Sequence, residues 1–145
     1  MEKAADRTED IREKLIQAAL EARGSASAPY SHYSVGAALL TEEGQIYTGG
    51  NIENASYGAA NCAERTAIYT AVSHGRRRFA AIAIAGGMEG KDPSEYAYPC
   101  GICRQVMQEF AKEDFRVIVA RSVNDYREYR LEELLPHGFG GDSIR

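Results

Sequence analysis

The chain has 145 residues, of which 44% are hydrophobic and 26% are charged, as in an ordinary globular protein. This length fits one compact domain over residues 1–145. The formal net charge of −4 argues against a nucleic-acid partner, because surfaces that bind nucleic acid need clustered excess Lys and Arg, and it favours a small-molecule substrate.

The sequence also argues against a membrane partner. No apolar stretch approaches the roughly 20 residues that span a bilayer, and residues 1–10 are acidic and polar, so we expect a cytoplasmic protein. Three cysteines cannot form a closed disulfide framework. In a reducing compartment, a Cys-x-x-Cys pair indicates metal binding or redox chemistry instead.

Hydrophobic periodicity predicts the elements of the first half. Residues 8–22 have apolar positions at helical spacing, which predicts an amphipathic helix ending near Gly24. Residues 35–40 form an apolar, strand-like run, residues 42–44 a turn, and residues 45–48 a returning strand, which together predict a hairpin. A connection rich in Gly and Asn follows.

The second half alternates strands with helices. Residues 62–74 predict a helix that stops at Gly75, residues 79–85 a buried strand, and residues 86–99 a loop. A helix beginning near residue 100 places Val106, Met107 and Phe110 in the core, before a strand at 115–120. A strand-like piece from residue 126, a short helical turn at 131–135 and a tail follow. The order strand, helix, strand, helix, strand indicates parallel pairing, so we expect an α/β sandwich with a mixed sheet.

All three cysteines lie in two short motifs. Cys62 opens the run Cys-Ala-Glu-Arg, and Pro99 precedes the pair Cys100 and Cys103. Each motif falls at a predicted helix N-terminus, where the partial positive charge of the helix favours thiolate over thiol. Three thiolates and one open coordination position are what a catalytic zinc site requires.

Other interpretations of the cysteines are weaker. They could be buried small hydrophobes or a redox pair, but neither explains the neighbouring Glu64 and Pro99. A structural zinc site usually has four protein ligands; no fourth cysteine exists, and the three histidines, His32, His74 and His137, lie outside the motifs.

Two residues beside Cys62 suit the chemistry of such a site. Three thiolates leave zinc a weaker Lewis acid than histidines would, and Arg65 is placed to donate to a ligand sulfur and offset this. Glu64, two residues from a ligand, is a carboxylate that can take a proton from water and pass it on, for which its pKa must be raised.

This layout, a first ligand two residues before a glutamate and a later Pro-Cys-x-x-Cys, is that of known zinc deaminases. Over nearly its whole length the chain resembles the cytidine deaminases. The resemblance is carried by Pro29-Tyr30-Ser31, Val35-Gly36-Ala37-Ala38-Leu39, Gly50-Asn51-Ile52-Glu53-Asn54-Ala55, Cys62-Ala63-Glu64-Arg65-Thr66-Ala67, Pro99-Cys100-Gly101 with Cys103-Arg104-Gln105, and Leu134-Leu135-Pro136.

The resemblance implies a three-layer α/β/α sandwich with a mixed five-stranded sheet and one Zn²⁺ per subunit, bound by Cys62, Cys100 and Cys103. It implies that Glu64 shuttles protons while hydroxide attacks C4 of cytosine in cytidine or 2′-deoxycytidine, giving uridine or 2′-deoxyuridine and ammonia, as in pyrimidine salvage. Arg65 would support the metal ligands. Substrate contacts would come from Tyr33 at the pyrimidine, Asn51 and Glu53 at the ribose, Ala63, and Phe139 of a neighbouring subunit in a homotetramer.

The chain also departs from the family pattern. Tyr33 stands where Phe is usual, Tyr98 where Ser is common, and Ile102 where a smaller residue is usual. Rival functions are deamination of a modified cytosine nucleoside such as blasticidin S, against which Asn51 and Glu53 argue, and silent zinc or nucleoside binding, against which Glu64 argues.

Some of these residues also have plain structural interpretations. Asn51 and Glu53 could cap a turn, and Phe139 could anchor the tail to the core. Residues 76–78 are three consecutive arginines, which after a helix-ending Gly are more typical of a solvated turn than of a nucleic-acid site.

Overall fold

The structure is a computed structural model that describes residues 4–144, and it describes side chains over residues 10–111 and 114–144. None of the helices within residues 4–144 has the length and apolar character needed to cross a membrane. The main elements are α1 (Ala4–Ala22), β1 (Tyr33–Thr41), β2 (Ile46–Gly50), α2 (Ala63–Ser73), β3 (Phe79–Met88), α3 (Gly101–Phe110), β4 (Ala111–Ser122), β5 (Asp125–Arg130) and α4 (Leu131–Leu134).

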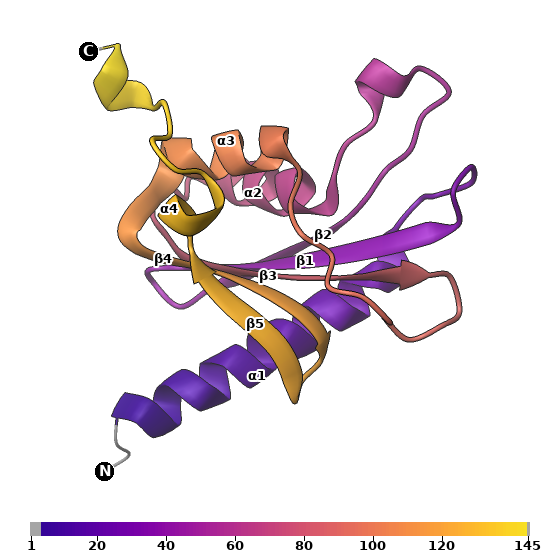
Figure 1. Cartoon of the computed structure of the whole chain (residues 1–145), viewed down its shortest axis with the longest axis horizontal. Helices are drawn as coiled ribbons and strands as arrows, with labels where there is room; N and C mark the ends of the chain where they lie inside the picture. The colour runs from indigo at the N-terminus through magenta and orange to yellow at the C-terminus, as the bar shows by residue number, and fades with distance from the viewer. Residues whose placement is uncertain (1–3, 145) are drawn as a thin grey trace.

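Helices cover both faces of one mixed sheet whose strand order is β2-β1-β3-β4-β5. Figure 1 shows α1 beneath the sheet and α2, α3 and α4 above it. The predicted three-layer α/β/α sandwich with a mixed five-stranded sheet is therefore confirmed.

The strand directions place two helix N-termini at the same edge of the sheet. β1 is antiparallel to both β2 and β3, and β3 is parallel to β4, so β2, β3 and β4 all run the same way. Helix α2 follows β2, and α3 follows β3. Because ligands bind beyond the carboxyl ends of parallel strands, this edge is where a site is expected in such a fold.

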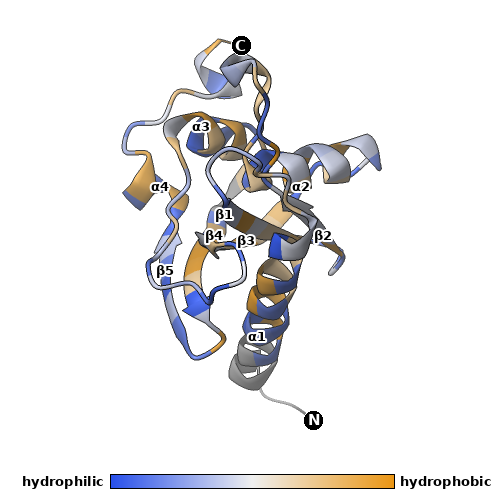
Figure 2. Cartoon of the chain, turned by 90° about the vertical axis from the view of Figure 1, so that its right-hand side faces the viewer, coloured by the Kyte–Doolittle hydropathy of each residue, from blue (hydrophilic) through white to orange (hydrophobic). Residues whose placement is uncertain are grey.

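The period of two along each strand separates two cores. Ala37, Ile82 and Val117 are buried against α2 and α3, whereas their neighbours Ala38 and Ala83 are buried against α1. Figure 2 shows β4 in mostly hydrophobic colours and β5, at the sheet edge, in hydrophilic ones. The charged side chains of β5 suit an edge strand, which must not pair with other chains.

The predicted turns have the expected backbone geometry. Gly44 of the β1–β2 hairpin and Gly75 after α2 have φ of +93° and +86°, in the left-handed region that glycine tolerates. Strands β1, β3 and β4 are longer than the predicted 35–40, 79–85 and 115–120. The strands are longer because their backbone pairing continues beyond the apolar runs from which they were predicted. The paired residues extend to Tyr33↔Met88 and to Phe79↔Ala111.

Helix α1 packs closely against β1 at Gly36. A Cβ at this position would lie 2.0 Å from the carbonyl oxygen of Ala19 and 2.6 Å from the backbone nitrogen of Arg23. Both atoms belong to the backbone, so neither can rotate away.

We therefore expect Gly36→Ala to lower the free energy of unfolding by more than about 3 kcal/mol, at the upper end of overpacking effects. Gly24→Ala is the matched control, since no atom lies within 4 Å of its added Cβ and its φ is not positive. Chemical denaturation followed by circular dichroism checks both variants. Equal stabilities of the two variants would contradict the close packing of α1 on β1.

Candidate active site

The connection from β2 to α2 folds back on itself and brings distant residues together. Ile52 and Asn61 exchange two backbone hydrogen bonds of 2.8 Å, which close a loop over residues 53–60. Asn51 and Glu53 thereby line the same pocket as Cys62, the next residue after Asn61. The chain thus joins two motifs that lie about ten residues apart in the sequence.

The three cysteine sulfurs converge where the N-termini of α2 and α3 meet. Cys62 and Cys100 are the N-caps of the two helices, and Cys103 lies in the first turn of α3. The Sγ atoms of Cys62 and Cys100 are 3.7 Å apart, and those of Cys100 and Cys103 are 3.5 Å apart. All three lie within 4.8 Å of one another, and none forms a disulfide.

These spacings fit a tetrahedral zinc site. A Zn–S bond of about 2.3 Å and a tetrahedral angle separate two ligand sulfurs by about 3.8 Å. Three sulfurs leave one coordination position open, as catalytic zinc sites do. The residues present therefore fit the metal, and Cys62, Cys100 and Cys103 are the groups that would hold it.

Arg65 supplies positive charge to the sulfur cluster. Its Nη2 donates a hydrogen bond of 3.3 Å to Sγ of Cys62, as the sequence led us to expect. The neighbouring thiols raise the pKa of Arg65 further, so it stays charged. Arg104 has a different role: its Nε and Nη1 donate to the carbonyls of Pro99 and Leu134, which fastens the loop before Cys100 to α4.

The thiols of the cluster differ in acidity. Hydrogen bonding to Cys103 and to the Arg65 guanidinium lowers the pKa of Cys62 to about 5, against the effect of burial. Sharing a proton with Cys62, together with burial, raises the pKa of Cys103. Cys62 is therefore the thiolate that is ready for a cation at neutral pH.

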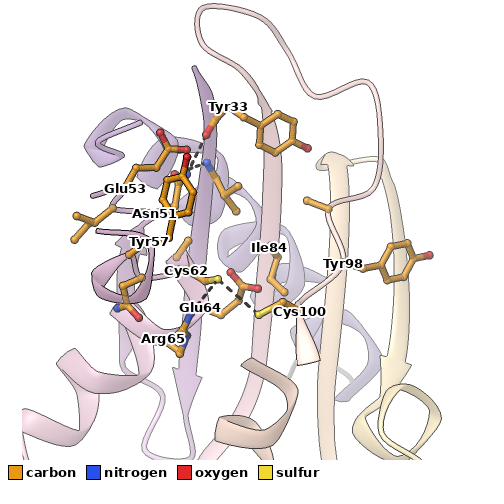
Figure 3. Close-up of a pocket in the computed structure, with 16 residues that line it drawn as sticks. Tyr33, Asn51, Glu53, Tyr57, Cys62, Glu64, Arg65, Ile84, Tyr98 and Cys100 are labelled. Carbon is orange, nitrogen blue, oxygen red and sulfur yellow. Dashed lines mark hydrogen bonds between the residues drawn. The ribbon is translucent and has the colours of Figure 1, made fainter. Parts of the chain in front are cut away.

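Glu64 is a buried carboxyl group beside the sulfurs. Only 4% of the residue is exposed, and burial raises its pKa to about 7. Figure 3 shows its carboxyl group next to Cys62 and Cys100. A group with a pKa near neutrality can both accept and donate a proton, which is what the chemistry proposed for Glu64 requires.

Cys62, Cys100 and Glu64 line a pocket of about 450 Å³. The pocket brings together most of the residues singled out in the sequence, and Figure 3 shows how they surround it. Those residues are Tyr33, Asn51, Glu53, Cys62, Ala63, Glu64, Arg65 and Cys100, while Cys103 is buried behind them.

Asn51 and Glu53 are both held by the chain that leads into β1. The side chain of Asn51 accepts from the backbone N–H of Val35 at 2.9 Å and donates to the carbonyl of Tyr33 at 3.0 Å. Glu53 accepts from the backbone N–H groups of Tyr30 and Ser31 and from the Ser31 hydroxyl. The alternative that these residues cap a turn is thus partly true, since Glu53 caps the turn at Tyr30 and Ser31.

Tyr33 has room for its ring because residue 86 is glycine. A Cβ on Gly86 would lie 3.0 Å from the Tyr33 ring and 3.0 Å from Cβ of Ala97. Burial, and the nearby Glu95 carboxylate, raise the pKa of Tyr33, so its hydroxyl stays neutral. The departure from the family's Phe is therefore accommodated within this pocket.

Several pocket residues were not foreseen from the sequence. Tyr57, Asn61, Ile84 and Ala97 also line it. Tyr57 is an aromatic residue between two motifs, and this was the one signal that the sequence offered for it. Its exposed loop has no periodicity from which the direction of the side chain could be predicted. Ile84 and Ala97 were indistinguishable from core and loop residues.

An aromatic and charged cluster fastens the loop that leads to Cys100. The Tyr96 hydroxyl donates to Asp125, and the guanidinium groups of Arg121 and Arg127 lie 4.9 and 4.5 Å from the centre of the Tyr96 ring. The hydroxyls of Tyr98 and Tyr129 are 2.7 Å apart. Tyr98, noted above as a departure from the family, thus bonds to β5 at one side of the pocket.

Phe139 is not among the described residues that line this chain's pocket. It is 58% exposed, and its carbonyl accepts from Nε2 of Gln105 at 2.7 Å. Figure 1 shows the tail leaving the body over the C-terminal half of α3, away from the start of that helix. The alternative that Phe139 anchors the tail in the core does not fit this exposure.

The chain is similar to known zinc-dependent proteins over most of its length. Residues 9–120 match the family described as the cytidine and deoxycytidylate deaminase zinc-binding region. A cytidine deaminase of Halalkalibacterium halodurans is 45% identical over 133 residues, covering 92% of this chain and 97% of that protein. One from Sporosarcina psychrophila is 45% identical over 91% of this chain and 93% of its own length.

Solved structures agree with the sequence comparisons. The crystal structure of cytidine deaminase from Burkholderia pseudomallei superposes with a TM-score of 0.77 at 47% identity, covering 87% of this chain and 97% of that one. That of cytidine deaminase from Mycobacterium tuberculosis superposes with a TM-score of 0.74 at 37% identity, covering 88% and 95%.

The raised pKa of Glu64 predicts how the stability of the metal-free protein depends on pH. The folded-state pKa of about 7 lies above the ordinary value of 4.5, so the contribution of Glu64 to stability is fully present below pH 4.5 and lost as pH rises through 7. Glu64→Gln removes this loss. With zinc chelated, the variant should gain about 2 to 3 kcal/mol relative to the parent between pH 5 and pH 8.

Urea denaturation at several pH values measures this difference, and Glu109→Gln is an exposed carboxyl control. Parallel stability curves for the Glu64→Gln variant and its parent would contradict the buried, neutral carboxyl group.

Proposed function

The chain belongs to the cytidine and deoxycytidylate deaminase family and is a cytidine deaminase enzyme, and we propose that it hydrolyses cytidine and 2′-deoxycytidine to uridine and 2′-deoxyuridine with release of ammonia. The observation that carries the proposal is that a cluster of three sulfurs at zinc-binding distances and a buried glutamate with a pKa near 7 meet at one pocket, which Cys62, Cys100 and Glu64 line.

The cysteines and Glu64 divide the chemistry between them. Cys62, Cys100 and Cys103 would hold zinc, which when bound would supply the Lewis-acid chemistry that makes water nucleophilic near neutral pH. Glu64 takes the proton that the attacking water loses and passes it to N3 of the base, and then passes the remaining proton of that water to the amino nitrogen. The amino group then leaves as ammonia, and water supplies the new carbonyl oxygen. During the reaction, Arg65 keeps its hydrogen bond to the Cys62 thiolate and balances its charge.

The polar residues of the pocket suit a nucleoside. Asn51 retains one N–H for a ligand, and Glu53 retains one acceptor position, so the pair can donate to and accept from the 3′-hydroxyl of a sugar. Tyr33 and Ala63 line the pocket and would contact the pyrimidine. A substrate without an ordinary sugar, such as blasticidin S, would leave the polar pair unmatched.

The wider setting is also part of the proposal. The whole chain would act as one deaminase domain, in the cytoplasm, on free nucleosides in pyrimidine salvage. Four subunits would assemble so that the exposed Phe139 of one reaches the pocket of another, which its position on the outward-lying tail supports.

The reaction is tested by following the ultraviolet absorbance of cytidine mixed with zinc-loaded protein. We expect the cytosine absorbance to fall and uridine and ammonia to form in equal amounts. Glu64→Gln should keep zinc and fold but lose at least about 10²-fold in kcat, because the proton shuttle is gone. Equal activity of parent and variant would overturn the role of Glu64, and conversion of blasticidin S alone would overturn the nucleoside assignment.

The assembly is tested by sedimentation and by Phe139→Ala. We expect a mass of four 15.9 kDa chains. Loss of the aromatic ring should raise KM for cytidine several-fold while zinc content and mass stay unchanged, with Ile144→Ala, another exposed apolar side chain of the tail, as the control. A fully active monomer would contradict a shared site.

A further inference from the structure

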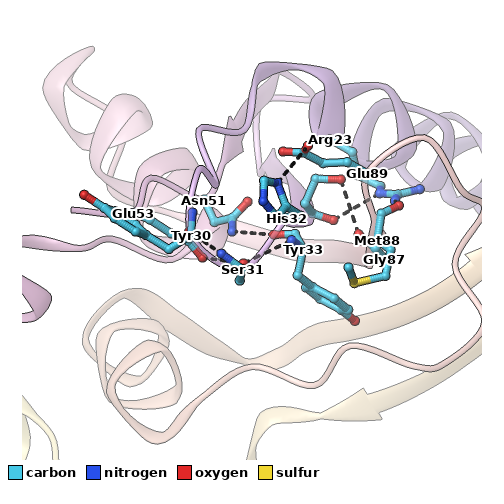
Figure 4. A network of polar contacts seen from close by, with 11 residues as sticks. Arg23, Tyr30, Ser31, His32, Tyr33, Asn51, Glu53, Gly87, Met88 and Glu89 are labelled. Carbon is cyan, nitrogen blue, oxygen red and sulfur yellow. Dashed lines mark hydrogen bonds and ion pairs between the residues drawn. The ribbon is translucent and has the colours of Figure 1, made fainter. Parts of the chain in front are cut away.

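Behind Glu53 lies a serine that does not line the pocket. Ser31 is exposed and belongs to the turn that precedes β1. Figure 4 shows Ser31 between Glu53 and Tyr33, joined to both by hydrogen bonds. Ser31 therefore acts on the pocket through residues that do line it, Glu53 and Tyr33.

The hydrogen bonds to Glu53 use its two oxygens unequally. Oε1 accepts from the backbone N–H groups of Tyr30 at 3.0 Å and Ser31 at 3.1 Å, which fills its acceptor positions. Oε2 accepts from the Ser31 hydroxyl. The two donors fix the position of Oε1, but they would still allow the rest of the carboxylate to rotate about this oxygen. The hydroxyl on the second oxygen stops this rotation.

The direction of the Ser31 hydroxyl is itself determined. The backbone N–H of Tyr33 donates to Oγ of Ser31 at 3.0 Å, which occupies an acceptor position of the hydroxyl. Because a carboxylate only accepts, the hydroxyl proton points to Glu53. This hydrogen bond is the largest cause of the lowered pKa of Glu53, with His32 as a smaller one.

Asn51 is hydrogen-bonded to the start of β1, the strand that follows Ser31. Its amide bonds to the carbonyl of Tyr33 and the N–H of Val35, while Ser31 bonds to the N–H of Tyr33. The two predicted sugar-binding side chains are thus both positioned relative to the backbone of Tyr33. When the plane of the Glu53 carboxylate is fixed, the distance and orientation between its free acceptor position and the Asn51 amide are fixed as well.

We propose that Ser31 is a positioning residue for the sugar: its hydroxyl fixes the plane of the Glu53 carboxylate, so that one acceptor position on Oε2 is held ready for the 3′-hydroxyl of the substrate. This inference rests on the proposed function, since it assigns the sugar to Glu53. It makes Ser31 a determinant of selectivity for nucleosides that carry this hydroxyl.

The test compares cytidine with 3′-deoxycytidine in three variants. Ser31→Ala removes the hydroxyl, Ser31→Thr retains it, and Ser56→Ala deletes a hydroxyl that makes no capping hydrogen bond at an exposed loop position outside the pocket lining. In Ser31→Ala, kcat/KM for cytidine should fall about five- to tenfold through KM, with kcat within about twofold and zinc content unchanged. The value for 3′-deoxycytidine should be unchanged, and Ser31→Thr and Ser56→Ala should behave as the parent.

Each other result has a definite meaning. An equal loss on both nucleosides would show a general structural role and overturn the inference, as would no loss on either. Should Ser31→Ala fail to fold, Ser31→Cys can replace it, because cysteine has a similar size and is a weaker hydrogen-bond donor. We then expect a smaller fall in kcat/KM for cytidine and no change for 3′-deoxycytidine. A zinc-loaded parent that does not convert cytidine would overturn the proposed function itself, and this inference with it.

Discussion

The whole site depends on one constraint, that two helices begin at the same edge of the sheet. Strands β2 and β3 run in the same direction, so the helices that follow them start side by side, and each start carries a cysteine as its N-cap. The backbone N–H groups there stabilise anionic sulfur, so the helix termini supply both the position and the charge state of the ligands. The remaining parts of the pocket are arranged around this meeting point.

The two carboxyl groups of the pocket show how the surroundings separate the tasks of similar side chains. Glu64 is buried and its pKa is raised to about 7, whereas Glu53 is solvated, held by Tyr30 and Ser31, and has a lowered pKa. The first can exchange protons near neutral pH, and the second stays a fixed acceptor. Two identical side chains thus serve as an acid–base group and as a binding group.

The sequence predicted what depends on short-range patterns. The metal ligands and Glu64 follow from spacing within two motifs, the helix end from Gly75 and the hairpin from Gly44. The rest depends on contacts between distant segments. The pairing of Ile52 with Asn61, the Asn51 amide bound to β1, and the contacts of Arg121 and Arg127 with the Tyr96 ring leave no periodic signal. Strand ends were missed for the same reason, since pairing partners extend them.

The distance along the chain between the metal ligands has a consequence for folding. Cys62 and Cys100 are separated by 38 positions but come together at 3.7 Å. A zinc ion held by both would act as a cross-link between α2 and α3, and because the unfolded chain has no preformed site, the free energy of metal binding would add to the stability of the folded protein. The cross-link would form without an oxidant and open whenever a chelator removes the ion. The ligands that equip this protein for chemistry would then also help to determine the temperature at which it unfolds.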